Sequence, residues 1–228
     1  MIQSLKLFSI KRWPLCCLLF YAFSCINPKE KKISSILKKD SFTEELITSK
    51  AFKQIHEVKD LVISGDLILR TGKDFTSELM RRLSQRDKTY SHCGIASWEN
   101  DTLFVYHMLG GEWNPDQKLR RDSFELFCNP YENRGFGVFR YKINTLQEKN
   151  IINQTHQYYQ QGVMFDMKFD LSTDDRMYCS EFIYKTVEKA AGDSIKLNTT
   201  TLDNIQFVAV DNLFFNKSCH EIKRIVFQ

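Results

Sequence analysis

Several common sequence features are absent from this chain. No two cysteines stand at the Cys-x-x-Cys spacing, so a zinc ribbon and a thioredoxin-type redox motif are both unsupported. There is no internal repeat and no low-complexity segment. The apolar run at residues 15–23 is shorter than the ~20 residues that a membrane-spanning helix needs. What is present is an ordinary globular composition, 43% hydrophobic and 26% charged over 228 residues, which suits one sizeable domain.

The net charge of the chain is also small. The formal charge of +4 includes Lys6, Lys11 and Arg12, which lie in a segment that we expect to be removed. Without these three, the 32 basic residues become 29, against 28 acidic ones. The basic run at residues 29–32 falls in a predicted linker. Because nucleic-acid binders carry a basic excess or a basic stripe, nucleic acid is not an expected partner.

The N-terminus has the pattern of an export signal. A basic stretch precedes the apolar run, whose length fits a secretory signal peptide. The run ends in residues 22–25 (AFSC), which resemble the lipobox of bacterial lipoproteins. We therefore predict a lipoprotein-type signal peptide over residues 1–24, lipidation at Cys25, a polar linker over residues 25–40, and one domain over residues 41–228. An ordinary signal peptide or a short membrane anchor is the alternative, and each version exports the protein.

Four cysteines remain after the predicted signal peptide: Cys93, Cys128, Cys179 and Cys219. Export would decide whether they meet an oxidising compartment. An oxidising compartment permits disulfides. A Cys128–Cys219 bridge is one possibility, which the sequence does not decide.

Helices and strands are mixed along the predicted domain. Periodicity predicts helices over residues 41–58, 74–85, 145–160 and 179–191, and strands over residues 61–70, 91–98, 102–109 and 135–142. Residues 121–127 suit a short helix or turn, and residues 204–210 and 222–227 suit final strands or helix ends. There is no regular βαβ rhythm. The pattern therefore indicates an α+β fold rather than a doubly wound α/β fold.

The helix that starts at Cys179 combines a thiol with a helix N-terminus. One face of it carries five residues at helical spacing, Cys179, Ile183, Thr186, Val187 and Ala190. Ser180 and Glu181 suit the helix start, and Gly192 suits its end. A thiol at this place feels the positive end of the helix dipole, which favours the nucleophilic thiolate. The alternative is a small buried cysteine in a core helix.

Two histidines lie on the predicted hairpin of residues 91–109. A two-residue turn at residues 99–100 would set His92 opposite His107. A turn at residues 100–101 would set His92 opposite Leu109, with His107 still on the same face. A three-residue turn would put the two histidines on opposite faces. We expect the face of His107 to meet the core, where an imidazole needs a polar partner. The other histidines of the domain are interpreted as surface or core residues: His56, His156 and His220.

Three motifs in this order resemble a known family. They are residues 65–69 (GDLIL), 90–95 (YSHCGI) and 178–182 (YCSEF). They are similar to those of the YiiX/YaeF-like permuted papain-fold amidases, bacterial relatives of the NlpC-type cysteine hydrolases. The resemblance spans roughly residues 61–192. It implies a circularly permuted papain-like (NlpC-type) fold, with an antiparallel β-sheet packed against helices and with the histidine strand preceding the nucleophile helix.

The resemblance also implies roles. Cys179 becomes the nucleophile and His92 the general acid and base. The family has a glutamate as the third member, whereas this chain offers His107, as the related lecithin:retinol acyltransferase-like enzymes do. Glu112 is an alternative third member, and Tyr178 either adds a hydroxyl to the site or packs.

The expected function is therefore a cell-envelope cysteine amidase or peptidase without metal or cofactor. Its expected substrate is a small amide or a peptide of peptidoglycan type, and its expected location is the membrane surface of the bacterial envelope through a lipid anchor. Two alternatives remain. One is a lipid acyltransferase or lipid hydrolase, for which an apolar entrance beside Cys179 is expected. The other is a non-catalytic envelope binding lipoprotein.

Overall fold

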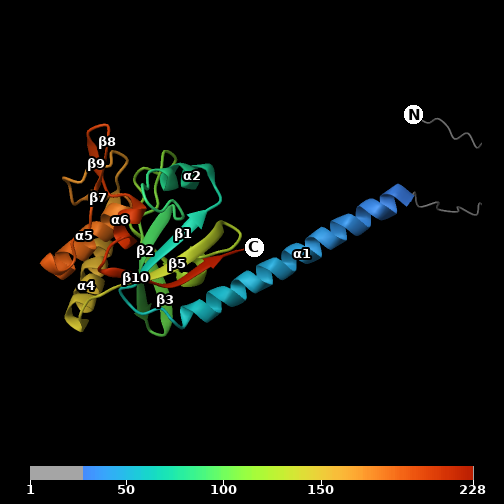
Figure 1. Cartoon of the computed structure of the whole chain (residues 1–228), viewed down its shortest axis with the longest axis horizontal. Coiled ribbons are helices and arrows are strands. Elements are labelled where there is room, and N and C mark those ends of the chain that lie inside the picture. Colours follow the sequence, from blue (N-terminus) through green and yellow to red (C-terminus); the bar gives the residue numbers. More distant parts are fainter. Residues whose placement is uncertain (1–27, 228) are drawn as a thin grey trace, which may run out of the picture. The chain divides into compact units, whose positions relative to one another are not determined.

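The computed structural model describes residues 28–227, with side chains from residue 44 onward (Figure 1). The predicted signal peptide of residues 1–24 and the predicted lipidation site Cys25 lie outside the described residues. Helix α1 spans Pro28–Lys59, so it covers both the predicted helix and residues 28–40 of the predicted linker. The chain divides into two units between Ser41 and Phe42. The second unit contains all the remaining helices and strands.

A six-stranded antiparallel sheet forms the framework of the second unit (Figure 1). Every pairing in it is antiparallel, and its strand order is β10-β5-β1-β2-β3-β4. The strands are β1 (Leu67–Gly72), β2 (His92–Glu99), β3 (Thr102–His107), β4 (Arg120–Ser123), β5 (Asn133–Tyr141) and β10 (Cys219–Val226).

The helices and the short strands surround this sheet. The helices are α2 (Phe75–Arg82), α3 (Phe124–Phe127), α4 (Thr145–Gln161), α5 (Cys179–Ala191), the 3₁₀ helix η1 (Gly192–Ser194) and α6 (Val210–Phe214). Two small sheets are formed by β6 (Met164–Phe165) with β7 (Arg176–Met177), and by β8 (Thr200–Leu202) with β9 (Ile205–Phe207). The mixture of an antiparallel sheet with separate helices confirms the predicted α+β class.

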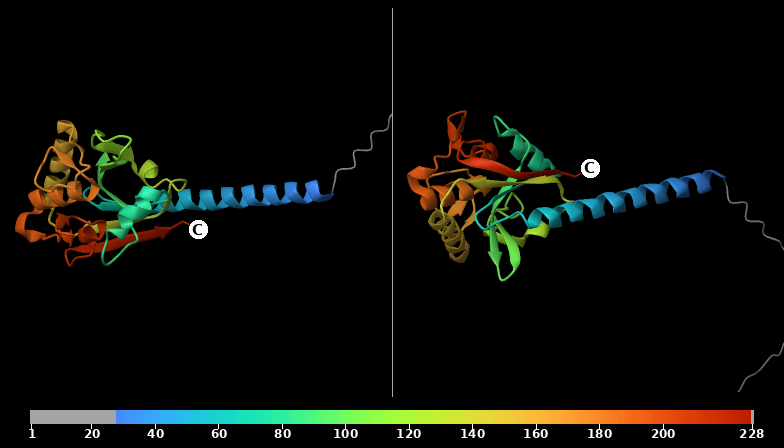
Figure 2. Two further views of the ribbon diagram at one scale, coloured as in Figure 1. Left: turned by 90° about the horizontal axis from the view of Figure 1, so that it is seen from above. Right: turned by 60° about the horizontal axis from the view of Figure 1, so that its bottom comes forward.

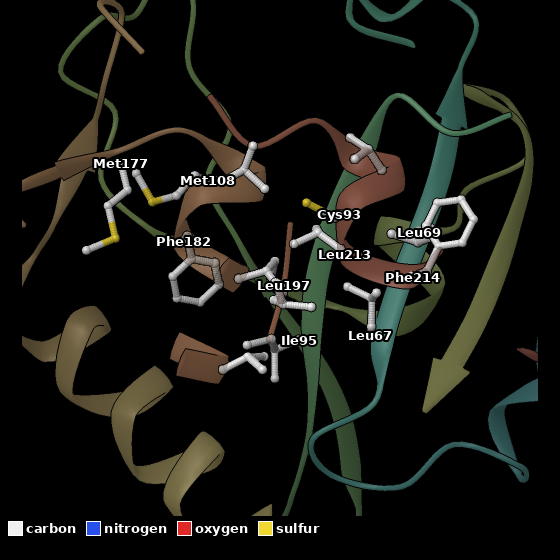
Figure 3. Packing of buried hydrophobic residues seen from close by; sticks show 14 of the residues in the cluster. Leu67, Leu69, Cys93, Ile95, Met108, Met177, Phe182, Leu197, Leu213 and Phe214 are labelled. Atoms are coloured by element: carbon white, nitrogen blue, oxygen red, sulfur yellow. The ribbon is translucent and has the colours of Figure 1, made fainter. Parts of the chain in front are cut away.

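Each face of the sheet has its own apolar cluster. On one face, side chains of β1 and β2 pack against α4, α5 and α6. Figure 3 shows Cys93 of β2 beside Leu213 of α6, and Leu69 of β1 beside Phe214 of α6. Both views of Figure 2 keep α4 beside α5, which agrees with the contacts between the two helices. This face positions the N-terminus of α5 against β2.

The other face of the sheet is covered by the end of α1 and by α3. Ile55 and Val58 of α1 and Phe127 of α3 contribute to its core, together with Val105 of β3. Because side chains alternate along a strand, His92 and Cys93 belong to opposite faces. His92 therefore lies on the α3 side, and Cys93 lies on the α5 side.

The first strand begins later than the sequence predicts. It starts at Leu67 rather than at residue 61, because Gly65 adopts a φ of +88° and the carboxylate of Asp66 accepts a hydrogen bond from the Ile63 N–H. Asp74 caps helix α2, since its carboxylate accepts a hydrogen bond from the Ser77 N–H. Two apolar side chains of α2 are exposed: Phe75 by 76% and Leu79 by 42%.

The cysteines of the domain form no disulfide. All four described cysteines are free, including Cys128 and Cys219. Cys128 belongs to the cluster on the α3 side of the sheet, whereas Cys219 belongs to the cluster on the α5 side. The possible Cys128–Cys219 bridge is therefore absent, because the sheet separates the two thiols.

Candidate active site

The hairpin of β2 and β3 sets the positions of the two histidines. Its turn consists of Asn100 and Asp101, both with positive φ (46° and 62°), which is the conformation of a two-residue turn of type I′. Glu99 pairs with Thr102, and the register continues to Ile95 opposite Tyr106. This is the second of the three registers that the sequence allowed, and it puts His92 and His107 on one face.

The two imidazoles are in direct contact. His92 Nε2 lies 2.9 Å from His107 Nδ1, and the ring of Phe127 packs against both. Gly94 makes room for this contact, because a Cβ at that position would lie 2.4 Å from Val105 Cγ1 and 3.2 Å from His107 Cβ. His107 is fully buried and His92 is 7% exposed. His92 is therefore the polar partner that a buried imidazole at position 107 needs.

A carboxylate anchors the other side of His107. Asp122 lies opposite Val105 in β4, and its Oδ2 is 3.0 Å from His107 Nε2. Arg120 Nη2 is 2.8 Å from the same oxygen. Burial raises the pKa of Asp122, but the hydrogen bonds from His107 and Arg120 outweigh it and hold the pKa below its usual value. Asp122 is therefore ionised at neutral pH.

This chain of contacts determines the proton on each ring. An ionised carboxylate only accepts hydrogen bonds, so His107 donates from Nε2. A neutral His107 then has a bare Nδ1, which accepts from the Nε2–H of His92. The neutral His92 is left with an unprotonated Nδ1. Asp122 and His107 thus fix which nitrogen of His92 is basic.

Both histidines are neutral at physiological pH. Burial lowers the pKa of His92 well below its usual value, and the charge of Arg70 adds to this effect. Burial likewise lowers the pKa of His107 to about 4, although Asp122 opposes the shift. A neutral His92 keeps the lone pair on Nδ1 available to accept a proton.

The thiol of Cys179 belongs to the first residue of α5. Tyr178 is the N-cap in an extended conformation, and the Glu181 carboxylate accepts from the Tyr178 N–H at 3.2 Å. The Ser180 hydroxyl donates to the Val208 carbonyl oxygen at 2.7 Å, which ties the start of α5 to the segment before α6. Cys179 itself is partly exposed. The thiol therefore has a rigid support and an open side.

Two surroundings of Cys179 favour its thiolate. A hydrogen bond from Cys93 is the largest influence and lowers the pKa of Cys179, while burial opposes it. The backbone N–H groups of Ser180 and Cys179 at the helix start lower it further. Burial raises the pKa of Cys93 far above its usual value, so Cys93 stays protonated and is the donor.

Cys179 and His92 line one cavity of about 600 Å³. They reach it from opposite faces of the sheet, at the end where β2 begins. The walls of the cavity are mainly apolar. They come from α2, from the segment between β3 and β4, and from β6 with the segment that follows it. The apolar side chains include Leu79, Met108, Trp113, Phe165, Met167 and Phe169. A volume of this size accommodates a small organic ligand. A second hollow of about 730 Å³, near Arg86 and Lys217, contains no cysteine or histidine.

The remaining predicted site residues have other places. The Tyr178 hydroxyl accepts from the Val208 N–H at 2.7 Å, so Tyr178 packs rather than offering a hydroxyl to the cavity. Glu112 lies at the cavity but is exposed, and Asp122 is the carboxylate that contacts His107. His56 and His220 are exposed, and His156 is partly buried beside Glu99.

Sequence reasoning missed two residues of this arrangement, Asp122 and Cys93. Cys93 stands next to His92 in the sequence motif, so it was visible, but nothing local indicated its contact with Cys179. Asp122 comes 15 residues after His107, and its role depends on the pairing of β3 with β4. The sequence pattern of residues 121–127, which include Asp122, predicted a short helix or turn instead of a strand.

No group of three or more His, Cys, Asp or Glu side chains in residues 28–227 is arranged to hold a metal ion. No helix in the same range has the length and apolar character needed to cross a bilayer.

Comparison with known proteins supports the architecture. No protein-family model matches the chain, and no curated protein matches it at a significant level. Among solved structures, the chain is similar to the crystal structure of the metalloprotein yiiX from Escherichia coli O157:H7. That match has a TM-score of 0.58 at 18% sequence identity and covers 72% of this chain and 97% of yiiX. The chain has a yiiX-like fold. At this identity the yiiX match concerns the fold, and the chemistry must be argued from the site.

Proposed function

We propose that the protein is a cysteine hydrolase that cleaves an amide or ester bond through an acyl-enzyme at Cys179. One observation carries the proposal. The Asp122–His107–His92 chain leaves a bare Nδ1 on His92, and His92 lines the same cavity as a thiol at a helix N-terminus. A nucleophile, a base and a group that orients the base are the three parts of nucleophilic catalysis.

The proposed reaction begins with proton transfer from the Cys179 thiol to Nδ1 of His92. The thiolate attacks the substrate carbonyl, and N–H groups at the start of α5 donate hydrogen bonds to the resulting oxyanion. His92 then gives its proton to the leaving amine or alcohol. Water, deprotonated by His92, attacks the thioester and releases the acid, which restores the thiol. His107 supports the positive charge on His92, and Asp122 supports His107.

A metal site does not fit the residues around Cys179 and His92. The yiiX protein, which shares the fold, is a metalloprotein. In residues 28–227 of this chain the His, Cys, Asp and Glu side chains do not gather into a set of three that fits a metal. In addition, the 2.9 Å contact between His92 Nε2 and His107 Nδ1 uses both nitrogens for a shared proton. We derive no step through a metal.

The favoured substrate class is a small amide or a peptide of the bacterial cell envelope. The resemblance of the GD, SHCGI and YCSE motifs to the YiiX/YaeF-like amidases supports amide cleavage. The lipobox-like residues 22–25 support an exported protein that is anchored at the membrane by a lipid on Cys25. In this arrangement the enzyme acts on material outside the cytoplasm.

An acyl-lipid substrate is the second candidate, and one observation favours it. The cavity that holds Cys179 has mainly apolar walls, and apolar side chains at its mouth are exposed: Trp113 is 98% exposed, Leu79 42% and Met167 41%. This is the apolar entrance that a lipid hydrolase or acyltransferase requires. A non-catalytic binding lipoprotein would have no need of the Asp122–His107–His92 chain.

Alkylation of the thiols tests the proposal directly. The protein is treated with iodoacetamide at neutral pH, and each cysteine is followed by mass spectrometry. Cys179 is expected to react well before Cys93, Cys128 and Cys219, which are buried. Equal rates would contradict an activated nucleophile. Incubation with peptidoglycan fragments and with phospholipid vesicles, using wild type and Cys179→Ala, then shows which substrate gives a Cys179-dependent product.

A further inference from the structure

One charged side chain of the cavity is not used by the proposed reaction. Arg70 stands opposite His92 in the pairing of β1 with β2, and it lines the cavity that contains Cys179. Its guanidinium lies over the ring of Phe127, with Cζ 4.7 Å from the ring centroid. The same ring packs against His92 and His107. Arg70 is therefore held beside the base.

Arg70 has no acidic partner in the described part of the chain. Its hydrogen bond runs from Nη1 to the Phe127 carbonyl oxygen at 3.1 Å. No carboxylate of residues 44–227 forms an ion pair with it; Glu132, which lines the same cavity, and Asp122 act on its charge only at longer range. Other arginines of the sheet do have such partners, for example Arg120 with Asp122 and Arg140 with Asp66.

A partly buried cation without a counterion is costly unless something else satisfies it. Burial lowers the pKa of Arg70, and the more distant charges of Glu132 and Asp122 offset this only in part. A guanidinium has five N–H donors in a planar fork that matches a carboxylate or a phosphate. Most of these donors remain available in Arg70, and the side chain is positioned at the cavity.

The rest of the cavity selects for an apolar group. Its walls include Leu79, Met80, Met108, Phe165 and Phe169. A ligand that suits both Arg70 and the apolar walls has an anionic group at the Arg70 end and an apolar body along the walls. Arg70 stands across the strand pair from His92, so the anionic group would lie on the His92 side of the cavity.

We propose that Arg70 binds an anionic group, a carboxylate or a phosphate, of a substrate whose apolar chain fills the cavity. This inference rests on the proposed function for the identity of the site, because it names the substrate class of that site. It does not depend on the chemistry at Cys179. A ligand of this class binds whether or not Cys179 is reactive.

The other role open to Arg70 is to act through His92. Its charge lowers the pKa of His92, so it could serve only to keep the base neutral. That role predicts a change in the pH dependence of catalysis and no preference of the cavity for anions. Binding measurements with ligands that do not react separate the two roles.

The test measures binding of octanoate, octyl phosphate and octanol to the purified full-length protein by titration calorimetry at pH 7.5. The three probes share one apolar chain. At least one of the anions is expected to bind about tenfold or more tightly than octanol, the effect of a charge-assisted hydrogen bond. The anion that binds more tightly identifies whether a carboxylate or a phosphate is the natural group. Equal binding of all three overturns the proposal.

Variants locate the effect. Arg70→Gln is expected to lose the preference for the anion, and Arg70→Lys, which keeps the charge without the planar fork, is expected to retain part of it. Arg82→Gln is the matched control, because Arg82 is an exposed arginine of α2 outside the cavity. An unchanged preference in Arg70→Gln overturns the proposal. If circular dichroism shows that Arg70→Gln does not fold, Arg70→Lys becomes the deciding variant. Wild-type affinity of Arg70→Lys for the anion would then mean that the guanidinium has no specific part in binding.

A further variant separates this proposal from the proposed function. Cys179→Ala is expected to bind the anionic probe as wild type does. If alkylation shows no activated thiol while the anionic probe still binds through Arg70, the reaction is wrong and the binding site stands. If Cys179 is activated but no anion is preferred, the reaction stands and the inference about Arg70 fails.

Discussion

The domain contains two clusters that join a histidine to a carboxylate, and they differ in how the imidazole is used. In the first, His107 contacts His92 with Nδ1 and Asp122 with Nε2. In the second, Nε2 of His156 lies 3.4 Å from Ser97 Oγ and 3.3 Å from Glu99 Oε1. Ser97, His156 and Glu99 have the composition of a hydrolase triad. Both contacts converge on one nitrogen, however, so the ring cannot pass a proton between them.

The surroundings of the two carboxylates differ as well. Glu99 also accepts hydrogen bonds from Tyr106 and Arg121, and Ser97 is only 1% exposed. Ser97, Glu99 and His156 are also not among the residues that line the cavity of Cys179. His92, by contrast, lies at a cavity. Composition therefore does not identify an active site, whereas the use of both ring nitrogens and access to a cavity do. The predictions below compare matched variants of the two clusters.

The largest expected effect is on the base. His92→Ala should reduce Cys179-dependent hydrolysis of p-nitrophenyl octanoate by about 100-fold or more, because general-base catalysis contributes that much. His156→Ala should leave the rate unchanged. Steady-state kinetics on both variants, with Cys179→Ala as the baseline, measures the difference. Equal losses in both would mean that the two clusters are equivalent.

The next effect concerns the residue that orients the pair. Asp122→Asn should lower the same rate by about tenfold to 100-fold, because an amide also donates and permits the wrong tautomer of His107. Glu99→Gln is the matched change in the other cluster and should have no effect. Nitrogen NMR of the imidazoles provides a readout that a purely structural role would not move. In Asp122→Asn the proton of His92 is expected on Nδ1 in part of the molecules.

Stability should depend on pH through the buried pair. The pKa of His107 is about 4 in the folded protein and ordinarily 6.5, so between these values the unfolded chain binds more protons. Stability should therefore fall as the pH decreases from 6.5 to 4, by up to about 3 kcal/mol for this one residue. Urea unfolding across this range measures it. His107→Gln should flatten the dependence, and an unchanged dependence in that variant would contradict the assignment.

The smallest expected effect is on the ionisation of the Cys179 thiol. Cys93→Ala removes the hydrogen bond that most lowers the pKa of Cys179. The pH at which alkylation of Cys179 reaches half its maximal rate should rise, and the rate at neutral pH should fall a few-fold, by less than for the histidine variants. Cys219→Ala is the control, since that thiol is buried elsewhere. A Cys93→Ala profile that coincides with wild type would leave the helix N-terminus as the only influence.

Much of this site could be predicted because its parts are local. The amphipathic pattern after Cys179 defines α5, and its first turn and its end follow from Ser180, Glu181 and Gly192. The hairpin was also local, and the sequence reduced its register to three possibilities. Choosing among them required the backbone of Asn100 and Asp101, because both residue types tolerate positive φ without requiring it.

The parts of the site that the sequence did not predict depend on contacts between distant segments. Asp122 meets His107 only because β4 pairs with β3. Cys93 meets Cys179 only because α5 packs on one particular face of β2. Arg70 attracted no attention as the last position of a predicted strand, and its lack of an acidic partner is a property of the folded chain. Leu79 of α2 lines the cavity, which its place in a predicted helix does not indicate.

The turn at Asn100 and Asp101 has a consequence for variation in this protein. It lies at the tip of a hairpin and has no place in the cavity, so exchanges such as Asp101→Gly that keep its left-handed backbone should be harmless. A single inserted residue there is a different matter. The two strands could still pair, yet His107 would turn to the α5 side while His92 stayed where it is. Loop length at a distant, solvent-facing tip would thus decide whether the two imidazoles of a folded protein can meet.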